Sequence, residues 1–406
     1  MERTPFLAAL SLLSQRMARM RLPEKEILRI LDANLNRARE GLRVVEEIAR
    51  FVFDDEALQK TTKSFRHQLA SLFAAYPRAG QRLPATEPAA VALDREMLID
   101  LGRDARGDVG KTSSTPREGR RVGLSDLIQA NFARIEESIR VLEEYTKPIL
   151  PEAGETPALH AATGVSPRLK AMRFDIYSLE KDYIRMANRA VKRVALKGIG
   201  LYPILDRDAM GGADPIAVAR QVLTPGVAMV QYRDKSSSAA EVCRVCDELR
   251  RMTSRKGVIL IVNDRADIAH AVGADGVHLG QDDMPVASAR EILGSKKIIG
   301  KSTHSFPQAR QALKEDIDYI AVGPIFSTPT KPGAKPVGCE LIVRVRAMTD
   351  KPIIAIGGIT AKNLPEVLDA GADGAAVISA ILKAKQIRTS TRALVDICRR
   401  KLKKKV

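Results

Sequence analysis

The stretch Val227-Ala-Met-Val-Gln-Tyr-Arg-Asp-Lys235 joins a short apolar run to a strongly polar end. The apolar run predicts a buried strand at residues 228–232. Successive side chains of a strand point to opposite faces, so Gln231, Arg233 and Lys235 should share one face. An amide and two cations on one face predict an anion site. A solvated strand end with ordinary charges is the alternative for this stretch alone.

Similar apolar runs recur along the chain from residue 201 onward, and most are separated by enough residues for a helix. Strands that alternate with helices are typical of α/β folds, and eight such units over roughly two hundred residues predict a (β/α)8 TIM barrel. A doubly wound sheet is the alternative, although it rarely needs eight units. The predicted strands span residues 201–205, 228–232, 258–262, 276–279, 297–300, 319–322, 352–356 and 374–378.

The ends of the third and fourth predicted strands carry acidic residues. In a TIM barrel the active site lies at the C-terminal ends of the strands, so these ends should converge. Asn263 and Asp264 follow the third strand, and Asp283 follows the fourth. The two carboxylates suit Mg²⁺, a hard cation that is held by one or two carboxylates and by substrate phosphate oxygens. Together with the cations of the second strand end, they predict a site for a metal-bound diphosphate.

The later predicted strand ends offer hydroxyl groups, one further cation and backbone amides. Ser302 follows the fifth strand, and the loop after the sixth strand contains Lys331. The seventh and eighth strands end at Gly357-Gly358 and Ile378-Ser379, where TIM barrels commonly bind phosphate through backbone N–H groups. These ends predict a second site, for a phosphate monoester.

The N-terminal half has a mainly helical pattern with an internal repeat, in which residues 33–47 match residues 130–144. Each copy carries an apolar stripe at helical spacing, so the two helices are expected to pack together with pseudo-twofold symmetry. The repeated polar residues would line a pocket between helices or form helix-edge hydrogen bonds to the partner helix. These residues are Asn34, Arg37, Asn131 and Arg134. The glutamates that end each copy, Glu46-Glu47 and Glu143-Glu144, are expected to lie on a solvated face.

Residues 105–112, between the two repeats, satisfy a loose form of a phosphate-binding loop, with Ala105 in place of the first glycine. Such a loop must follow a buried strand and open a helix, but the flanking residues make a thin strand and a poor helix. The alternative is a polar active-site loop that contains Asp104, Asp108 and Lys111.

The boundary between the two halves is marked by composition. Residues 148–167 are rich in Pro, Ala, Gly and Thr and predict a linker. A long basic helix is expected from residue 167 to about residue 194. The sequence therefore predicts a mainly helical domain at residues 1–195 and a barrel domain at residues 196–406.

Composition narrows the class of ligand. The formal net charge of +17 favours anionic partners, but only 4% of residues are aromatic and none is Trp, which disfavours the stacking surfaces of nucleic-acid binders. Small phosphorylated ligands fit better. Four irregularly spaced cysteines predict no disulfide framework, so a cytoplasmic location is expected, and no apolar run is long enough to span a membrane. Cys243 and Cys246 are expected to pack within a helix.

The C-terminal half, from about residue 200 to 400, resembles the thiamine-phosphate synthase family. The matching motifs are Gln-x-Arg-x-Lys at 231–235, Asn263-Asp264, residues 273–283, Gly323-Pro-Ile-Phe326, Thr328-x-Thr-Lys331, Gly357-Gly-Ile-Thr360 and residues 377–379. The resemblance implies that Asp264 and Asp283 hold Mg²⁺. It implies that hydroxymethylpyrimidine diphosphate is bound by Gln231, Arg233, Lys235, Asn263, Ser302 and Lys331. It implies that hydroxyethylthiazole phosphate is bound by Thr328, Thr330, Gly358, Ile378 and Ser379.

The catalytic candidates under this resemblance are Arg233, Lys235, Lys331 and Ser302, because cations next to a departing diphosphate stabilise its charge. A thiazole tautomerase on the same barrel is the alternative. Such an enzyme need not retain the diphosphate-binding cations or both metal carboxylates, so their presence favours the transferase.

The N-terminal half resembles a helical domain that is fused to some of these synthases and is assigned as a hydroxymethylpyrimidine-phosphate kinase. The matching features are the two Ala-Asn-x-x-Arg-x-x-Glu copies and Asp108-Val-Gly110. The resemblance implies that this domain uses ATP and makes the diphosphate that the barrel consumes. A structural dimerisation module is the alternative, and a homo-oligomer is compatible with either.

Overall fold

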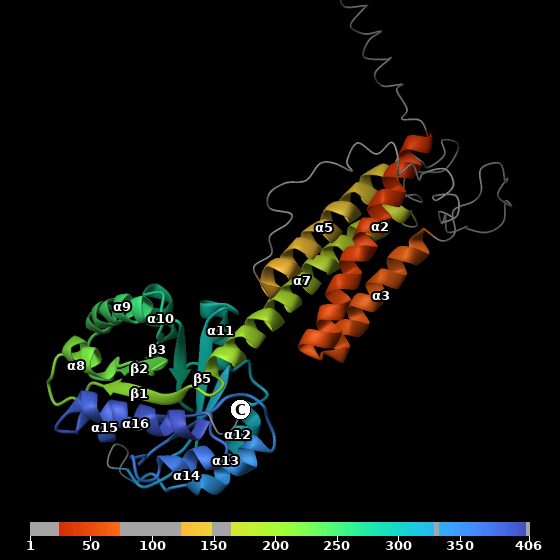
Figure 1. Ribbon diagram of the computed structural model, residues 1–406. Coiled ribbons are helices and arrows are strands. Elements are labelled where there is room, and N and C mark those ends of the chain that lie inside the picture. The colour runs from red at the N-terminus through yellow and green to blue at the C-terminus, as the bar shows by residue number, and fades with distance from the viewer. Residues whose placement is uncertain (1–23, 74–122, 148–163, 329–332, 403–406) are drawn as a thin grey trace, which may run out of the picture. The chain divides into compact units, whose positions relative to one another are not determined.

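The computed structural model describes residues 24–73, 123–147, 164–328 and 333–402. The chain divides into two compact units, residues 1–187 and 188–406. Helices and strands are labelled in Figure 1. The predicted linker at residues 148–167 and the loop at residues 105–112 lie largely or wholly outside the described ranges, and so does Asp108.

The first unit is built from long amphipathic helices that run side by side (Figure 1). Its described elements are α2 (Glu24–Ile48), the π-helical turn η1 (Ala49–Phe53), α3 (Glu56–Leu72), α5 (Leu124–Tyr145) and the first part of α7 (Val165–Leu196). The apolar stripes of the two sequence repeats lie on α2 and α5 and are buried in one core. A Cβ added at Gly41 on α2 would lie 2.7 Å from Ile135 Cγ1 on α5, so the two repeats pack in close contact.

One prediction for the repeats was wrong. Glu46 and Glu143 are buried rather than solvated, at 5% and 3% exposure. Each carboxylate accepts a hydrogen bond from an arginine on the helix that follows its repeat, Arg66 Nε at 2.9 Å for Glu46 and Arg173 Nε at 3.2 Å for Glu143. Burial of a charge is tolerated where such a partner is present. The repeat therefore extends beyond sequence to equivalent ion pairs.

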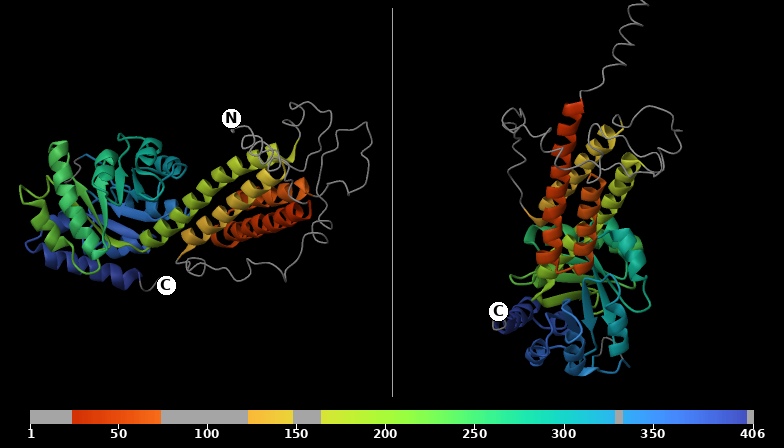
Figure 2. Two further views of the ribbon diagram at one scale, coloured as in Figure 1. Left: turned by 90° about the horizontal axis from the view of Figure 1, so that it is seen from above. Right: turned by 90° about the vertical axis from the view of Figure 1, so that its right-hand side faces the viewer.

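The second unit is a closed barrel of parallel strands in the order β1 to β8, as predicted, with helices around it (Figure 2). The strands are β1 (Gly200–Asp206), β2 (Met229–Arg233), β3 (Ile259–Asn263), β4 (Gly276–Leu279), β5 (Ile298–Thr303), β6 (Tyr319–Val322), β7 (Ile353–Ile356) and β8 (Gly374–Val377). The helices are α8 (Pro215–Val222), α9 (Ala239–Lys256), α10 (Ala266–Ala271), α11 (Val286–Leu293), α12 (Phe306–Ala312), α13 (Gly338–Arg346), α14 (Leu364–Asp369), α15 (Ser379–Leu382) and α16 (Ile387–Leu402).

Strand β5 is longer than its apolar run predicts. Pairing with β6 continues through Ser302, opposite Ala321, and Thr303, opposite Val322. Ser302 therefore lies within the strand rather than after it. This places its side chain in the interior face of the sheet, where it lines the pocket described below.

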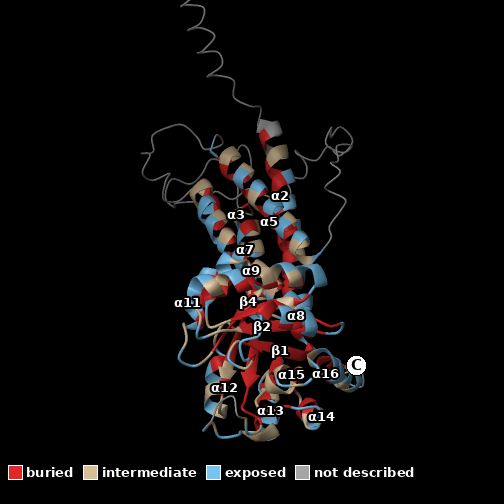
Figure 3. Ribbon diagram, turned by 90° about the vertical axis from the view of Figure 1, so that its left-hand side faces the viewer, coloured by how far each residue is buried: buried red, intermediate tan, exposed pale blue. Residues whose placement is uncertain are grey.

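Apolar packing fills the barrel on both sides of its sheet, and the strands are almost continuously buried (Figure 3). One cluster joins the outer faces of the strands to the helices, and a second fills the interior around Tyr202, Ile261 and Tyr319. Gly300 makes room for this interior cluster, because a Cβ at that position would lie 2.0 Å from Tyr319 Cζ. None of the helices within the described ranges has both the length and the apolar content that a membrane crossing requires.

The two cysteines of the C-x-x-C sequence lie on α9 as free thiols. Cys246 is fully buried and Cys243 packs against the same core. Burial raises the pKa of the Cys246 thiol to about 12, which keeps it protonated and unreactive. The expected packing role is confirmed.

The close approach of α2 and α5 makes Gly41 a sensitive test of the repeat packing. Gly41→Val is expected to lower the free energy of unfolding by about 1–3 kcal/mol, because the added atoms overlap Ile135 and the Asn131 carbonyl. Glu40→Val is the matched control, since it places the same side chain at an exposed position of α2. Calorimetry of the full chain measures both. Equal unfolding midpoints for the two variants would contradict the packing.

Candidate active site

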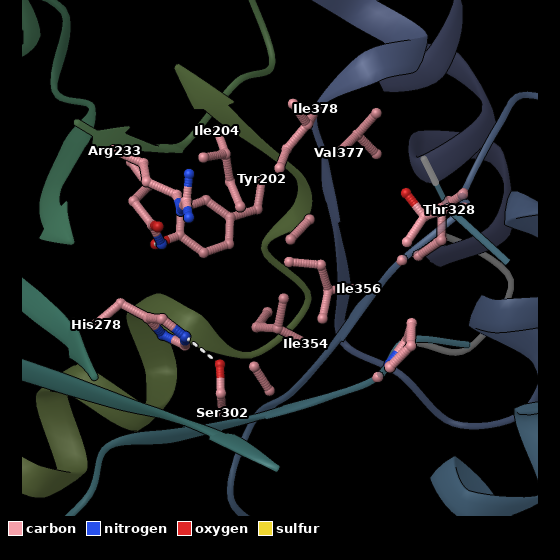
Figure 4. A pocket seen from close by; sticks show the side chains of 18 of the residues that line it. Tyr202, Ile204, Arg233, His278, Ser302, Thr328, Ile354, Ile356, Val377 and Ile378 are labelled. Carbon is pink, nitrogen blue, oxygen red and sulfur yellow. Dashed lines mark hydrogen bonds between the residues drawn. The ribbon is translucent and has the colours of Figure 1, made fainter. Parts of the chain in front are cut away.

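The C-terminal ends of the strands surround one pocket, to which the first, second, third, fourth and fifth strands contribute polar side chains (Figure 4). The closed order of the barrel brings these ends together although they are far apart in sequence. The predicted site residues that line this pocket are Gln231, Arg233, Asn263, Ser302, Thr328, Gly358, Ile378 and Ser379. Two further predicted residues, Thr330 and Lys331, lie outside the described residues.

Arg233 is held by a carboxylate that the sequence analysis did not select. Its Nη1 donates to Asp206 Oδ2 at 2.5 Å, and Asp206 is 1% exposed at the end of β1. Asp206 Oδ1 also accepts from the Ala209 N–H at 2.9 Å. The guanidinium has five N–H donors, so this contact orients it and leaves donors for a ligand. Asp206 follows the first predicted strand directly, which is the signal that would have identified it.

A second group of charges joins the ends of β2, β3 and β4. Lys235 Nζ lies 2.8 Å from Asp264 Oδ2, and Asp283 Oδ2 accepts from the Gly280 N–H at 2.6 Å. Asp264 has a φ of 61°, in the left-handed region that non-glycine residues seldom occupy. Asp264 and Asp283 lie together as predicted, since a hydrogen bond between their carboxyl groups shifts the pKa of each.

The two carboxyl groups have opposite pKa shifts. Burial and the neighbouring Asp283 raise the pKa of Asp264 above its ordinary value. Burial alone would raise the pKa of Asp283 as well, but hydrogen bonds from Asp264 and the Gly280 N–H hold it below its ordinary value. Interaction between two carboxyl groups disfavours the ionisation of one of them, because like charges repel.

Polar groups inside the barrel connect two of the predicted residues. Gln231 Nε2 donates to Tyr202 OH at 2.8 Å, and Ser302 Oγ lies 2.8 Å from His278 Nε2 (dashed in Figure 4). His278 is 7% exposed, and its Nδ1 lies 2.9 Å from Tyr319 OH. No role was predicted for Tyr202, His278 or Tyr319. Each lies in a predicted strand, but the local sequence does not show that their side chains are in contact.

The opposite side of the pocket is formed by backbone. Gly357 and Gly358 have φ values of 101° and 64°, and a Cβ at either would lie 2.5 Å from Pro324 or Ser327 backbone atoms. Only glycine fits such positions without strain. The backbone therefore approaches the pocket closely beside Thr328 and the start of α15.

The predicted residues of the helical unit fall into two kinds. Asn34 and Asn131 are buried, and each donates its Nδ2 hydrogen to its own helix, to the Ile30 carbonyl at 2.8 Å and the Leu127 carbonyl at 2.7 Å. Arg37 and Arg134 are exposed. The two copies thus behave alike, because each asparagine bonds to its own helix rather than to the partner helix and the arginine three residues later is exposed.

Known proteins match this chain over both halves. The family described as thiamine monophosphate synthase matches residues 201–381, and the ThiD2 family matches residues 29–182. A thiamine-phosphate synthase of Gloeobacter violaceus is 39% identical over 361 residues, which are 89% of this chain and 94% of that protein. One from Synechocystis sp. is 37% identical, over 91% of this chain and 95% of that protein. The solved thiamine phosphate pyrophosphorylase of Pyrococcus furiosus is 35% identical, with a TM-score of 0.48, over 52% of this chain and 99% of its own.

Replacing Asp264 or Asp283 by Asn is expected to have opposite effects on the stability of the fold. The folded-state pKa of Asp264 is raised, so its ionisation destabilises the fold once the pH exceeds the ordinary value of 3.8. Asp264→Asn is therefore expected to raise the midpoint of thermal unfolding at pH 7 in the absence of metal ions. This gain should disappear as the pH falls below the ordinary value.

Asp283→Asn serves as the matched comparison, with the opposite sign. The folded-state pKa of Asp283 is lowered, so its ionised form stabilises the fold at pH 7, and that stability is lost as the pH falls through the lowered pKa. The variant should therefore unfold at a lower temperature than the wild type at pH 7. Calorimetry over a series of pH values measures both variants. Shifts of the same sign at pH 7 would show that the two carboxyl groups are not distinguished in this way.

Proposed function

This chain belongs to the thiamine-phosphate synthase family, and we propose that its barrel pocket is where hydroxymethylpyrimidine diphosphate is joined to hydroxyethylthiazole phosphate. The enzyme is a transferase. In the reaction the bond between the pyrimidine methylene carbon and diphosphate breaks, and a bond from that carbon to the thiazole nitrogen forms. The observation that carries the proposal is one pocket lined at one end by Gln231, Arg233 and Asn263 and at the other by Gly358 and Ser379.

Arg233 lines the pocket, and Lys235 follows it at the same strand end without lining the pocket; both are proposed to bind the diphosphate. Departure of diphosphate leaves an electron-rich pyrimidine cation, so the negative charge that develops on the leaving group needs fixed positive charge beside it. Asp206 orients the Arg233 guanidinium before substrate arrives, which lowers the cost of ordering it. Lys331 and Ser302 complete this end of the site under the proposal.

Asp264 and Asp283 are the residues that would hold Mg²⁺. Their chemistry fits this ion, because the two carboxyl groups interact with each other and offer hard oxygen ligands to a cation. An ion held by two carboxylates would take its other ligands from phosphate and water. When bound, Mg²⁺ would neutralise charge on the departing diphosphate.

The thiazole phosphate is assigned to the opposite wall of the pocket. There Gly358, Ile378, Ser379 and Thr328 line the pocket, and the backbone N–H groups of the first three with the Thr328 hydroxyl are proposed to bind the phosphate. Binding both substrates in one pocket holds the thiazole nitrogen next to the reacting carbon. Proximity of this kind can supply much of the rate enhancement, and no general base is required.

A thiazole tautomerase on the same barrel is not favoured. Tautomerisation moves a proton and releases no diphosphate, so it has no use for two cations and two carboxylates at the ends of β2, β3 and β4. All four of these groups are present at that edge, with Lys235 and Asp264 in contact.

Removing one charge from the proposed diphosphate end should abolish turnover. Arg233→Ala and Asp264→Ala are each expected to lower kcat/KM for thiamine phosphate formation by about 100-fold or more, with the fold intact. Arg265→Ala is the matched control, because Arg265 is exposed beside the site and pairs with Asp267. Steady-state assays with both substrates and Mg²⁺ measure the effect. Turnover near the wild-type level in Arg233→Ala would refute the diphosphate assignment.

For the helical domain, residues 1–195, we propose a hydroxymethylpyrimidine-phosphate kinase that uses ATP. The supporting observation is the match of residues 29–182 to the ThiD2 family, next to a barrel that consumes the diphosphate product. The γ-phosphoryl group of ATP would pass to the substrate monophosphate, leaving ADP. Arg37 and Arg134 are exposed arginines at equivalent positions of the two repeats and are proposed to contact phosphate, with Asn34, Asn131 and Asp108 as further candidates.

The full chain carrying Arg233→Ala tests this kinase without consumption of its product. ATP-dependent formation of pyrimidine diphosphate from the monophosphate is expected, and Arg134→Ala should lower its kcat/KM by about tenfold or more. Arg43→Ala is the control, because this exposed arginine of α2 pairs with Glu47 on the helix surface. Absence of turnover at high enzyme concentration would reject the kinase and favour a structural dimerisation domain.

A further inference from the structure

A continuous chain of hydrogen bonds crosses the barrel interior. It runs from Gln231 on β2 to Tyr202 on β1, then to Tyr319 on β6, His278 on β4 and Ser302 on β5, with distances of 2.8, 3.1, 2.9 and 2.8 Å. Strands β1 and β6 are not neighbours in the barrel, so the bond between the two tyrosine hydroxyls spans its interior. Both ends of the chain line the substrate pocket.

The middle of this chain is sealed from solvent. Tyr202 and Tyr319 are 1% and 0% exposed, and burial raises the pKa of both well above the ordinary value, so each keeps its single hydroxyl hydrogen. The Tyr319 ring stacks on His278, with ring centroids 5.6 Å apart, and occupies the space left by Gly300. Each hydroxyl can therefore donate in one direction only along the chain.

The direction of donation is fixed by the amide of Gln231. Its Nε2 donates to Tyr202, so Tyr202 donates to Tyr319 and Tyr319 donates to His278 Nδ1. A neutral imidazole that accepts at Nδ1 carries its hydrogen on Nε2 and donates it to Ser302 Oγ. Gln231 is then left with its carbonyl oxygen as an acceptor and with one remaining N–H, and Ser302 is left with its hydroxyl hydrogen as a donor.

Turning the Gln231 amide over would reverse every bond in the chain. The carbonyl oxygen would accept from Tyr202, and Ser302 would donate to His278 Nε2, so Gln231 would offer an N–H group and Ser302 only lone pairs. The two ends of the hydrogen-bond chain, Gln231 and Ser302, therefore change their hydrogen-bonding character together. A buried network of this kind links groups that do not touch each other.

We propose that Tyr202, Tyr319 and His278 are positioning residues that set the hydrogen-bonding polarity of Gln231 and Ser302 jointly. Through them the pocket selects a pyrimidine that presents a donor, its exocyclic amine, to Gln231 and an acceptor to Ser302. This inference rests on the proposed placement of the pyrimidine diphosphate in the barrel pocket. It adds a specificity device for which none of the three residues needs to contact the reacting atoms.

A double-mutant cycle tests the link. Gln231→Ala and Ser302→Ala, alone and together, are made in the wild-type chain and in Tyr319→Phe, and kcat/KM for the pyrimidine diphosphate is measured. In the wild-type protein, loss of Gln231 leaves the hydrogen-bond network free to run in either direction. Ser302 therefore contributes less to kcat/KM once Gln231 has been removed. The double variant should therefore lose less than the product of the two single losses, by about fivefold or more.

In Tyr319→Phe the ring and its packing remain, but the hydrogen-bond network is interrupted. The losses of kcat/KM from Gln231→Ala and Ser302→Ala should therefore multiply. Tyr183→Phe is the matched control, because it removes a hydroxyl that is equally buried in the helical unit, where it bonds to Thr62 and the Val45 carbonyl. It should leave the coupling unchanged. If Tyr319→Phe does not fold, Tyr202→Phe cuts the adjacent bond and carries the same expectation.

The outcomes separate this inference from the function proposed above. Full activity of both single variants would show that the pyrimidine site is misplaced, and the inference would fall with it. Large single losses that multiply in the wild-type chain would keep the site but overturn the linkage. Coupling that persists undiminished in Tyr319→Phe would also overturn it, because the two residues would then communicate by another route.

Discussion

Closure of the parallel sheet is the constraint on which the rest of the barrel depends. The pairing of β1 with β8, from Gly200 opposite Gly374 to Pro203 opposite Val377, completes a ring in which every strand runs in the same direction. All the C-terminal strand ends therefore open onto one face. Residues as distant in sequence as Gln231 and Ser379 line one pocket for this reason, and neither strand end could form the site alone.

Charge at the site is balanced before any ligand binds. Arg233 is matched by Asp206, and Lys235 by Asp264, so these two proposed diphosphate-binding cations each have a carboxylate partner. Such pairing limits the penalty for holding cations in a partly buried pocket. Asp264 and Asp283 also interact with each other, and the pKa of Asp264 is raised while that of Asp283 is lowered. The pocket is thus organised around charges that a metal diphosphate would rearrange.

Buried charges are also paired in the helical unit, in the same way in both repeats. Gly41 allows α2 and α5 to approach closely, and the two buried glutamates Glu46 and Glu143 are each met by an arginine from the next helix. Ion pairs at equivalent positions indicate that the repeat preserves a packing arrangement as well as a sequence. Arg37 and Arg134 are exposed at equivalent positions of the two repeats, so they are not part of this buried packing.

The sequence by itself determined the strands, the repeat helices and the polar residues at the strand ends, because apolar periodicity and strand alternation are local properties of the chain. It even placed Ser302 next to the correct strand, although the strand runs longer through its pairing with β6. Only the tertiary structure decided which polar groups meet. Asp206 reaches Arg233 from the neighbouring strand, and Tyr202 reaches Tyr319 across the barrel, through contacts that no local pattern encodes. Interior side chains of a closed barrel find their partners through its geometry, and that geometry exists only once the ring is complete.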